Sequence, residues 1–201
     1  MKQNFFTKLL GDVHYAMNLR EHAMVSHLTP DEKRERLGAY AGRYSTFIET
    51  GTYLGETTQA MSKLYGEVHT IEVSPELHAK AAQRFAGNAA VTCHLGDSAD
   101  VLPRIVGSLT KPAVFWLDGH YAGPRTGRAN AYDTPIIREL EIIFQNSKKD
   151  HMILIDDARQ FVGRNSYPRI GVLREYVRSH SQYFLTIRDD IIRLAYDPEW
   201  S

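Results

Sequence analysis

The chain has little of several features that would place a protein in a special class. Its 201 residues include one cysteine, Cys93, so no disulfide can form within the chain. Lysine plus arginine equals aspartate plus glutamate at 24 each, and the net charge of zero provides no broad basic field for nucleic acid. No apolar run approaches the length that spans a bilayer, and the first one is broken too early for a signal peptide. We therefore expect a soluble, cytoplasmic protein without a nucleic-acid or membrane partner.

Length and composition suit a globular protein with one core. Hydrophobic residues make up 43% of the chain and charged residues 24%, and no repeat or linker marks a boundary. Residues 1–43 are polar and helix-prone, so we predict an N-terminal helical arm there and a single domain over residues 44–201. Within the arm, Thr29 is typical of a helix start, and we interpret the charged cluster at residues 31–36 as a solvated helix face. The arm could cover a substrate pocket or form the contact of a homodimer.

From residue 44 onward, short apolar runs alternate with segments of helix length. This pattern is typical of α/β proteins in which helices cover both faces of a mostly parallel sheet. The last two runs are separated only by Asp189 and Asp190, which predicts an antiparallel hairpin. The sequence therefore predicts a Rossmann-like, doubly wound, seven-stranded sheet that ends in this hairpin. The expected strands cover residues 45–50, 68–73, 91–96, 113–118, 151–156, 182–188 and 191–196.

Residues 47–58 combine the end of a strand, a tight turn and a helix start, with Gly51 and Gly55 in the turn. Glycine allows a positive φ and the close approach of a ligand, and a helix N-terminus offers free N–H donors. Glu72 ends the next strand twenty-one residues after Gly51, the spacing at which Rossmann-like units place a carboxylate on ribose hydroxyls. Ser74, followed by proline, then begins a further helix. The stretch predicts a cofactor-binding turn, although it lacks the middle glycine of the dinucleotide-binding motif.

Acidic residues follow the predicted strands, at the edge where an open α/β sheet binds its ligands. Five strands end in at least one acid, which is more than loop composition alone would give. Asp97 and Asp157 can be explained as helix N-caps, but this explanation does not apply to Asp118, which precedes a glycine-rich loop. The strand ends are Glu49-Thr50-Gly51, Glu72, Gly96-Asp97-Ser98, Asp118-Gly119-His120-Tyr121 and Asp156-Asp157.

With these residues the chain resembles the class I S-adenosylmethionine (SAM) dependent methyltransferases, over roughly residues 44–197. The turn E-T-G-T-Y-L-G, the acid Glu72, the G-D-S after the third strand and the final hairpin fall where that family has them. The resemblance implies that Glu49 lines the methionine part of SAM, that Glu72 holds the ribose hydroxyls, and that Asp97 and Ser98 approach the adenine. The implied cofactor-binding residues are Glu49, Thr50, Gly51, Thr52, Tyr53, Gly55, Thr57, Glu72, Val73, Asp97, Ser98 and Asp118.

A narrower likeness concerns the strand ends F-W-L-D-G-H-Y and I-L-I-D-D-A. They are similar to those of metal-dependent O-methyltransferases, such as catechol O-methyltransferase and the macrocin-type sugar O-methyltransferases. The likeness implies a divalent cation, Mg²⁺ for example, held by Asp118, Asp156 and Asp157, and hard carboxylate oxygens suit such an ion. A cation there would lower the pKa of a coordinated hydroxyl and so promote its attack on the methyl group.

Individual residues depart from the family pattern. Tyr53 stands where many members carry glycine. Where the catechol enzyme has a lysine base, this chain has Tyr121 preceded by His120. We predict His120 as general base, because imidazole titrates near neutral pH, and Tyr121 as second choice; a structural loop histidine is the alternative. The glycine-rich loop that follows is predicted to cover the acceptor, with Arg125 or Arg128 binding an acidic or phosphorylated group, unless it is only a solvated loop.

The function predicted from these residues is SAM-dependent, metal-assisted methyl transfer to a hydroxyl of a small acceptor, such as a sugar-containing compound. Two alternatives remain open: a metal-binding enzyme of the same fold with a different reaction, and a non-catalytic cofactor-binding module. An NAD-dependent dehydrogenase ranks below these. The turn lacks two of the three expected features of that fingerprint, and the acidic strand ends have no role in hydride transfer.

Overall fold

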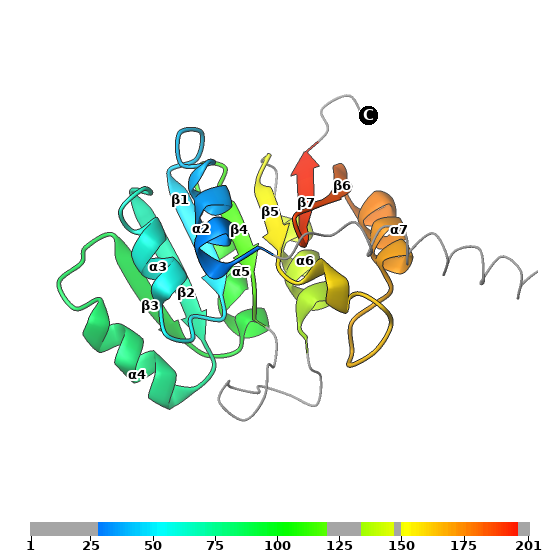
Figure 1. Cartoon of the computed structure of the whole chain (residues 1–201). Coiled ribbons are helices and arrows are strands. Elements are labelled where there is room, and N and C mark those ends of the chain that lie inside the picture. The colour runs from blue at the N-terminus through cyan, green and yellow to red at the C-terminus, as the bar shows by residue number, and fades with distance from the viewer. Residues whose placement is uncertain (1–27, 120–133, 147–149, 197–201) are drawn as a thin grey trace, which may run out of the picture.

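The computed structural model describes residues 28–119, 134–146 and 150–196. One sheet of seven strands, in the order β3-β2-β1-β4-β5-β7-β6, runs through this part of the chain (Figure 1). The strands from β3 to β5 are parallel, whereas β7 is antiparallel to both β5 and β6. The predicted fold class is confirmed, and each expected strand is correct to within one residue at either end. The strands are β1 Thr46–Thr50, β2 Glu67–Glu72, β3 Val91–Leu95, β4 Val114–Leu117, β5 Met152–Ile155, β6 Tyr183–Arg188 and β7 Ile191–Tyr196.

The C-terminal hairpin is also confirmed, with Asp189 and Asp190 as its two turn residues. Both have a positive φ, at 56° and 61°, as a type I′ turn requires. Asp190 is 1% exposed, and its carboxylate accepts a hydrogen bond from the backbone N–H of Arg159 at 2.9 Å. The turn therefore ties the hairpin to the segment that follows β5.

Side chains of the central strands alternate between two hydrophobic cores, one on each face of the sheet. On one face, Ile48, Phe115 and Ile153 pack in a core with α5, α6 and α7. On the other face, Phe47 and Trp116 share a core with α2 and α3, the helices that lie in front of the sheet in Figure 1. Within the described ranges, no helix is long and apolar enough to cross a membrane. The helices are α2 Pro30–Gly38, α3 Glu56–Met61, α4 Pro75–Arg84, α5 Ser98–Ser108, α6 Ile136–Asn146, η1 Ala158–Gln160 and α7 Ile170–His180.

The helix start predicted at Thr29 is confirmed by α2. The Thr29 hydroxyl accepts a hydrogen bond from the backbone N–H of Glu32, and the Glu32 carboxylate accepts one from the backbone N–H of Thr29 at 2.7 Å, forming a capping box. Leu37 is 1% exposed, and its carbonyl accepts a hydrogen bond from the Tyr65 hydroxyl at 2.7 Å. These contacts fix α2 against the sheet; the earlier residues of the predicted arm lie outside the described ones.

Candidate active site

Gly51 brings the end of β1 close to the end of β4. Its φ is +86°, and a Cβ atom here would lie 2.6 Å from the carbonyl oxygen of Asp118. Only glycine combines this conformation with this approach. Gly55, at φ +73°, is the N-cap of α3. The predicted tight turn is therefore present, with both of its glycines at positive φ.

Tyr53 lies in the same turn and has a φ of 49°, in the left-handed region that favours glycine. Glycine would adopt this conformation without strain, whereas tyrosine rarely does. The Tyr53 side chain is 42% exposed and lines the pocket described below. The tyrosine thus accepts a strained backbone and adds aromatic surface to the pocket.

The Glu72 carboxylate connects the turn to the start of α4. One oxygen accepts a hydrogen bond from the backbone N–H of Tyr53 and the other from that of Ser74, each at 2.9 Å. Each carboxylate oxygen has a further lone pair, so a bond to ribose hydroxyls is compatible with these contacts. The ribose-binding role of Glu72 stays a prediction.

Glu49 is a buried acid at the end of β1. Its Oε2 atom accepts hydrogen bonds from the hydroxyls of Thr58 at 2.5 Å and Thr70 at 3.0 Å. Burial raises the pKa of the Glu49 carboxyl to about 7, although the two hydroxyl bonds act in the opposite direction. A cationic ligand beside Glu49 would therefore find a group that can ionise near neutral pH.

A pocket of about 290 Å³ opens at the carboxyl ends of β1, β4 and β5. Open α/β sheets bind their ligands at this edge. The turn between β1 and α3 forms one wall, and α2 forms another. The lining residues are Pro30, Lys33, Arg34, Leu37, Glu49, Gly51, Thr52, Tyr53, Leu54, Glu56, Thr57, Trp116, Asp118 and Asp156.

Strand register explains why acids from different strands meet in this pocket. Glu49 and Trp116 are register partners, and Trp116 packs on the face that α2 covers. Asp118 stands two residues after Trp116 and so continues the same face. The last residues of β4 and β5 are also register partners, and Asp118 and Asp156 follow them directly. The structure therefore brings these two predicted residues to one pocket.

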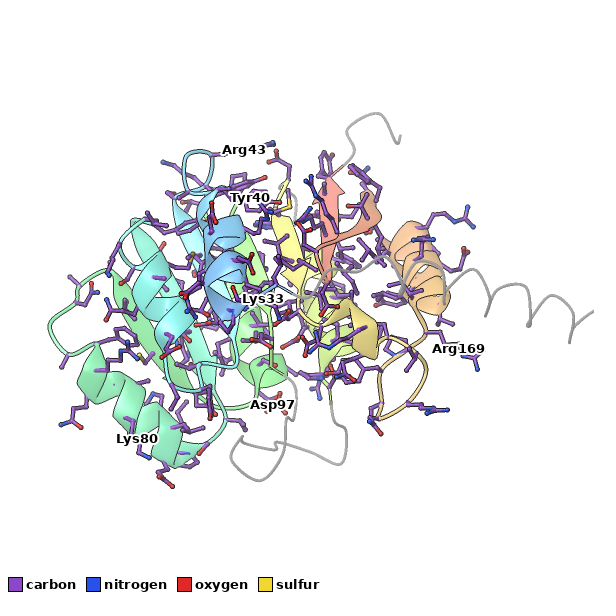
Figure 2. All side chains as sticks on the ribbon, viewed as in Figure 1. Lys33, Tyr40, Arg43, Lys80, Asp97 and Arg169 are labelled. Carbon is purple, nitrogen blue, oxygen red and sulfur yellow. The ribbon has the colours of Figure 1, made fainter. Side chains whose placement is uncertain are left out.

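Lys33 of α2 is an exception to the solvated helix face predicted at residues 31–36, where Asp31, Glu32, Glu35 and Arg36 are exposed as expected. Its Nζ atom donates hydrogen bonds to both oxygens of Asp156 at 2.6 and 2.8 Å and to Oδ1 of Asp157 at 3.3 Å. Lys33 stands one helical turn before the buried Leu37, so it shares the face that α2 turns toward the sheet. Figure 2 labels it on α2, over the centre of the sheet.

The electrostatics of this contact favour a charged lysine. Burial lowers the pKa of the Lys33 ammonium, but the charges of Asp156 and Asp157 and the hydrogen bonds to them outweigh burial and raise that pKa above its ordinary value. Burial and the charge of Asp157 raise the pKa of the Asp156 carboxyl, an effect that Lys33 opposes. Lys33 therefore offsets part of the cost of placing two acids side by side.

Arg159 provides a second cation for the acidic pair. Its guanidinium lies 2.7 Å from Oδ1 of Asp157 and also forms an ion pair with Asp190. Asp157 itself has a positive φ of 56° and makes no side-chain cap to η1, so the N-cap interpretation describes its position but not its contacts. The two acids are thus paired with cations from two distant parts of the chain.

These pairings bear on the predicted divalent cation. Both oxygens that Asp156 would offer to a metal ion accept hydrogen bonds from Lys33. Among residues 28–119, 134–146 and 150–196, no group of three or more His, Cys, Asp or Glu side chains is placed to hold a metal ion. The acids in this arrangement do not fit a divalent ion beside Lys33.

Several predicted residues do not line the pocket. Asp97 caps α5, because its carboxylate accepts a hydrogen bond from the backbone N–H of Ala99 at 2.9 Å; its N-cap interpretation is confirmed. Asp157 is bound to Lys33 and Arg159 at the pocket's edge. The predicted cofactor residues that do not line the pocket are Thr50, Gly55, Glu72, Val73, Asp97 and Ser98. Four further predicted residues, His120, Tyr121, Arg125 and Arg128, lie outside the described residues.

Seven residues that line the pocket were not predicted from the sequence: Pro30, Lys33, Arg34, Leu37, Leu54, Glu56 and Trp116. Lys33 and Trp116 have the clearest chemistry among them. The spacing of Lys33 and Leu37 could have placed the lysine on the inner face of its helix. Trp116 carries no such signal, because a tryptophan in an apolar run is typical of any buried strand. It is 2% exposed, and its indole N–H has no hydrogen-bond partner among the residues that the structure describes.

Comparison with known proteins gives structural matches alone. No protein-family model and no curated protein sequence matches the chain. The O-methyltransferase TomG from Streptomyces achromogenes, involved in tomaymycin synthesis and solved with SAM, is 19% identical with a TM-score of 0.59, over 90% of this chain and 86% of TomG. A putative caffeoyl-CoA O-methyltransferase from Staphylococcus aureus is 16% identical with a TM-score of 0.60, over 96% of this chain and 100% of that one. An O-methyltransferase from Bacillus cereus, in complex with SAH, is 14% identical with a TM-score of 0.59. The match covers 91% of this chain and 88% of that one.

Identities this low establish a shared fold. The sheet order differs from the 3-2-1-4-5-6 order of dinucleotide-binding dehydrogenases, because antiparallel β7 lies between β5 and β6. This difference counts against the NAD-dependent alternative. The chain has the class I SAM-dependent methyltransferase fold, which it shares with these O-methyltransferases.

Proposed function

We propose that the protein is a SAM-dependent methyltransferase that transfers the methyl group to a hydroxyl of a small acceptor, such as a sugar-containing compound. One observation carries the proposal: a single pocket joins the glycine turn to the acidic ends of β4 and β5. The turn side suits a cofactor, since Gly51 leaves room for a close approach to the backbone. The acidic side suits an acceptor, because hydroxyl groups donate to carboxylates.

The pocket residues divide between cofactor and acceptor in this proposal. Glu49 faces the positively charged methionine part of SAM. Glu72 does not line the pocket but accepts a hydrogen bond from the backbone N–H of the lining residue Tyr53, and in this proposal it holds the ribose. Asp118 and Asp156 bind the acceptor hydroxyls at the far side of the pocket. The main task of the protein is then to place the acceptor oxygen in line with the methyl carbon and the sulfur.

Proton removal from the acceptor is assigned to residues predicted from the sequence. His120 directly follows Gly119 and stays our candidate for the general base, with Tyr121 as second choice. Arg125 and Arg128 stay candidates for binding an acidic or phosphorylated group of the substrate. All four positions can be tested by substitution.

Metal assistance is the second candidate, favoured by the adjacent positions of Asp118 and Asp156. The reaction proposed above includes no metal-dependent step, because both oxygens of Asp156 accept hydrogen bonds from Lys33. Methyl transfer measured with and without a chelator separates the two candidates: activity lost with EDTA and restored by Mg²⁺ favours the metal-assisted reaction.

Calorimetric titration of SAM and of its demethylated product, S-adenosylhomocysteine, tests the cofactor assignment. We expect both to bind, and Glu72→Ala to weaken them by at least about tenfold, which corresponds to about 1.4 kcal/mol. Glu76→Ala is the matched control, because Glu76 is an exposed acid in the first turn of α4, four residues after Glu72. Thermal unfolding of each variant separates lost binding from lost structure, since Glu72 also holds two backbone N–H groups.

A failure to bind the cofactor and a failure to transfer the methyl group have different meanings. Wild-type protein that binds neither SAM nor its product would overturn the proposal. Binding without methyl transfer to a panel of hydroxylated small molecules would instead favour a different reaction on the same fold, or a non-catalytic cofactor-binding module.

A further inference from the structure

Lys33 and the Asp156–Asp157 pair form a compact ionic group at the pocket. The ammonium group has three N–H donors, and three carboxylate oxygens lie within hydrogen-bond distance: both of Asp156 and one of Asp157. The Lys33 side chain is 18% exposed and that of Asp156 is 8% exposed. This contact therefore differs from surface ion pairs, in which solvent competes with the partners.

The position of Lys33 does not depend on this ion pair alone. The capping box fixes the start of α2, Leu37 packs in the core, and Arg36 contacts Asp189 in the hairpin turn at 3.3 Å. The start of α2 is therefore ordered by its own capping box and its last turn is docked by Arg36 and Leu37, so the lysine side chain extends from a docked helix toward the acids.

A divalent ion and Lys33 compete for the same atoms. An ion about 2.1 Å from an Asp156 oxygen, the distance that Mg²⁺ requires, would lie within about 5 Å of the Lys33 nitrogen. Two cations this close repel strongly where water is excluded. Either Lys33 leaves the pair or the ion stays out.

We propose that Lys33 is the built-in counter-cation of the Asp156–Asp157 pair and occupies the place of a divalent ion, so that the site binds no such ion while α2 is docked. Arg159 provides further positive charge at Asp157, which shares this arginine with Asp190. The role of Lys33 toward a substrate rests on the proposed function. If the pocket binds a methyl acceptor, Lys33 positions Asp156 toward that acceptor and supplies positive charge near its oxygen.

Binding of Mn²⁺ to the full-length protein, followed by electron paramagnetic resonance without SAM or acceptor, tests this proposal. We expect wild-type protein to bind Mn²⁺ weakly. Lys33→Met keeps a long unbranched side chain but removes the charge, and we expect it to gain at least tenfold in Mn²⁺ affinity. Adding Asp156→Asn to that variant should abolish the gain, whereas Lys33→Arg should behave like wild type.

A matched control and a second measurement keep the test decisive. Lys80→Met removes an exposed lysine of α4, labelled in Figure 2 far from Lys33, and should leave Mn²⁺ binding unchanged. Tight Mn²⁺ binding by wild type that Asp156→Asn removes would overturn the proposal, and so would a folded Lys33→Met variant without any gain. If Lys33→Met does not fold, wild type and Asp156→Asn alone still decide the question. Because no SAM is present, these outcomes are independent of whether the proposed function holds.

Discussion

The Glu49 carboxylate and the Thr58 hydroxyl form a buried hydrogen bond of 2.5 Å where β1 meets α3. Burial raises the pKa of Glu49 to about 7, so its charge changes near neutral pH. Under the proposed function, SAM places a positive charge beside this group and favours the ionised carboxylate. Proton release from Glu49 should therefore accompany SAM binding.

We expect the affinity for SAM to rise by up to about tenfold as the pH increases from about 6 to about 8. The sign follows from the ionisation of Glu49 in this range, since only its charged form attracts the ligand. Calorimetry across that pH range measures the effect. Glu49→Gln should remove most of the pH dependence, and any dependence that remains in this variant reports the titration of other groups, on SAM or on the protein. The prediction would be contradicted if the SAM affinity of wild type and of Glu49→Gln changed equally with pH.

The same group makes a prediction for the ligand-free protein. Its folded-state pKa of about 7 lies above the ordinary glutamate value of 4.5, so the folded state holds a proton that the unfolded state releases. Stability is therefore fully present below about pH 4.5 and falls as the pH rises through about 7, by on the order of 3 kcal/mol. Urea unfolding at a series of pH values checks this, and the loss should be smaller in Glu49→Gln.

Gly51→Ala should destabilise the protein by about 2 kcal/mol or more and abolish SAM binding. The added Cβ would lie 2.6 Å from the Asp118 carbonyl oxygen, at a φ of +86°. Gly107→Ala is the matched control, because a Cβ at this position near the end of α5 meets open space. We expect the control to raise the unfolding free energy by about 0.5–1 kcal/mol. If the two substitutions had similar effects in thermal unfolding, the close approach to the Asp118 carbonyl would not require a glycine at position 51.

Tyr53→Asn should separate backbone strain from ligand contact. Asparagine tolerates the left-handed conformation better than tyrosine, so we expect thermal stability to stay the same or rise slightly. SAM affinity should fall, because the ring that lines the pocket is lost. Tyr53→Phe keeps the ring and should bind SAM like wild type. Undiminished affinity in Tyr53→Asn would remove Tyr53 from the cofactor site.

Local sequence patterns were sufficient for the elements of this fold. Short apolar runs between segments of helix length predicted the strands, and the two-residue connection at Asp189 and Asp190 predicted the hairpin, because each depends on neighbouring residues alone. The start of α2 was predictable for the same reason, since its capping box lies within four residues. The acidic strand ends were predicted to meet at one edge of the sheet, because the carboxyl ends of parallel strands lie at the same edge.

The contacts within the pocket were less predictable. Lys33 and Asp156 are separated by 123 residues, and no local pattern encodes that pairing. A helix with charged residues on most positions and one buried leucine resembles a solvated helix, so the charge at Lys33 hid its inward position. Asp97 had two possible roles in the sequence, and only coordinates could show the hydrogen bond that makes it a cap.

The buried indole N–H of Trp116 leads to the last prediction. The ring lines the pocket, and its N–H has no partner among the residues that the structure describes. A buried donor of this kind gains by bonding to a ligand, so we expect Trp116→Phe to weaken binding of SAM or of the acceptor by about threefold to tenfold. The lost volume should also reduce the unfolding free energy by about 1–2 kcal/mol.

A control for that loss of volume is available on the opposite face of the same strand. Phe115 is fully buried in the core with α5 and α6 and does not line the pocket. Phe115→Leu should therefore lower the thermal stability to a similar degree and leave ligand binding unchanged. Calorimetry on both variants makes the comparison. Equal losses of affinity would assign the effect of Trp116→Phe to packing, whereas a loss confined to Trp116→Phe assigns it to the indole ring and its N–H in the pocket wall.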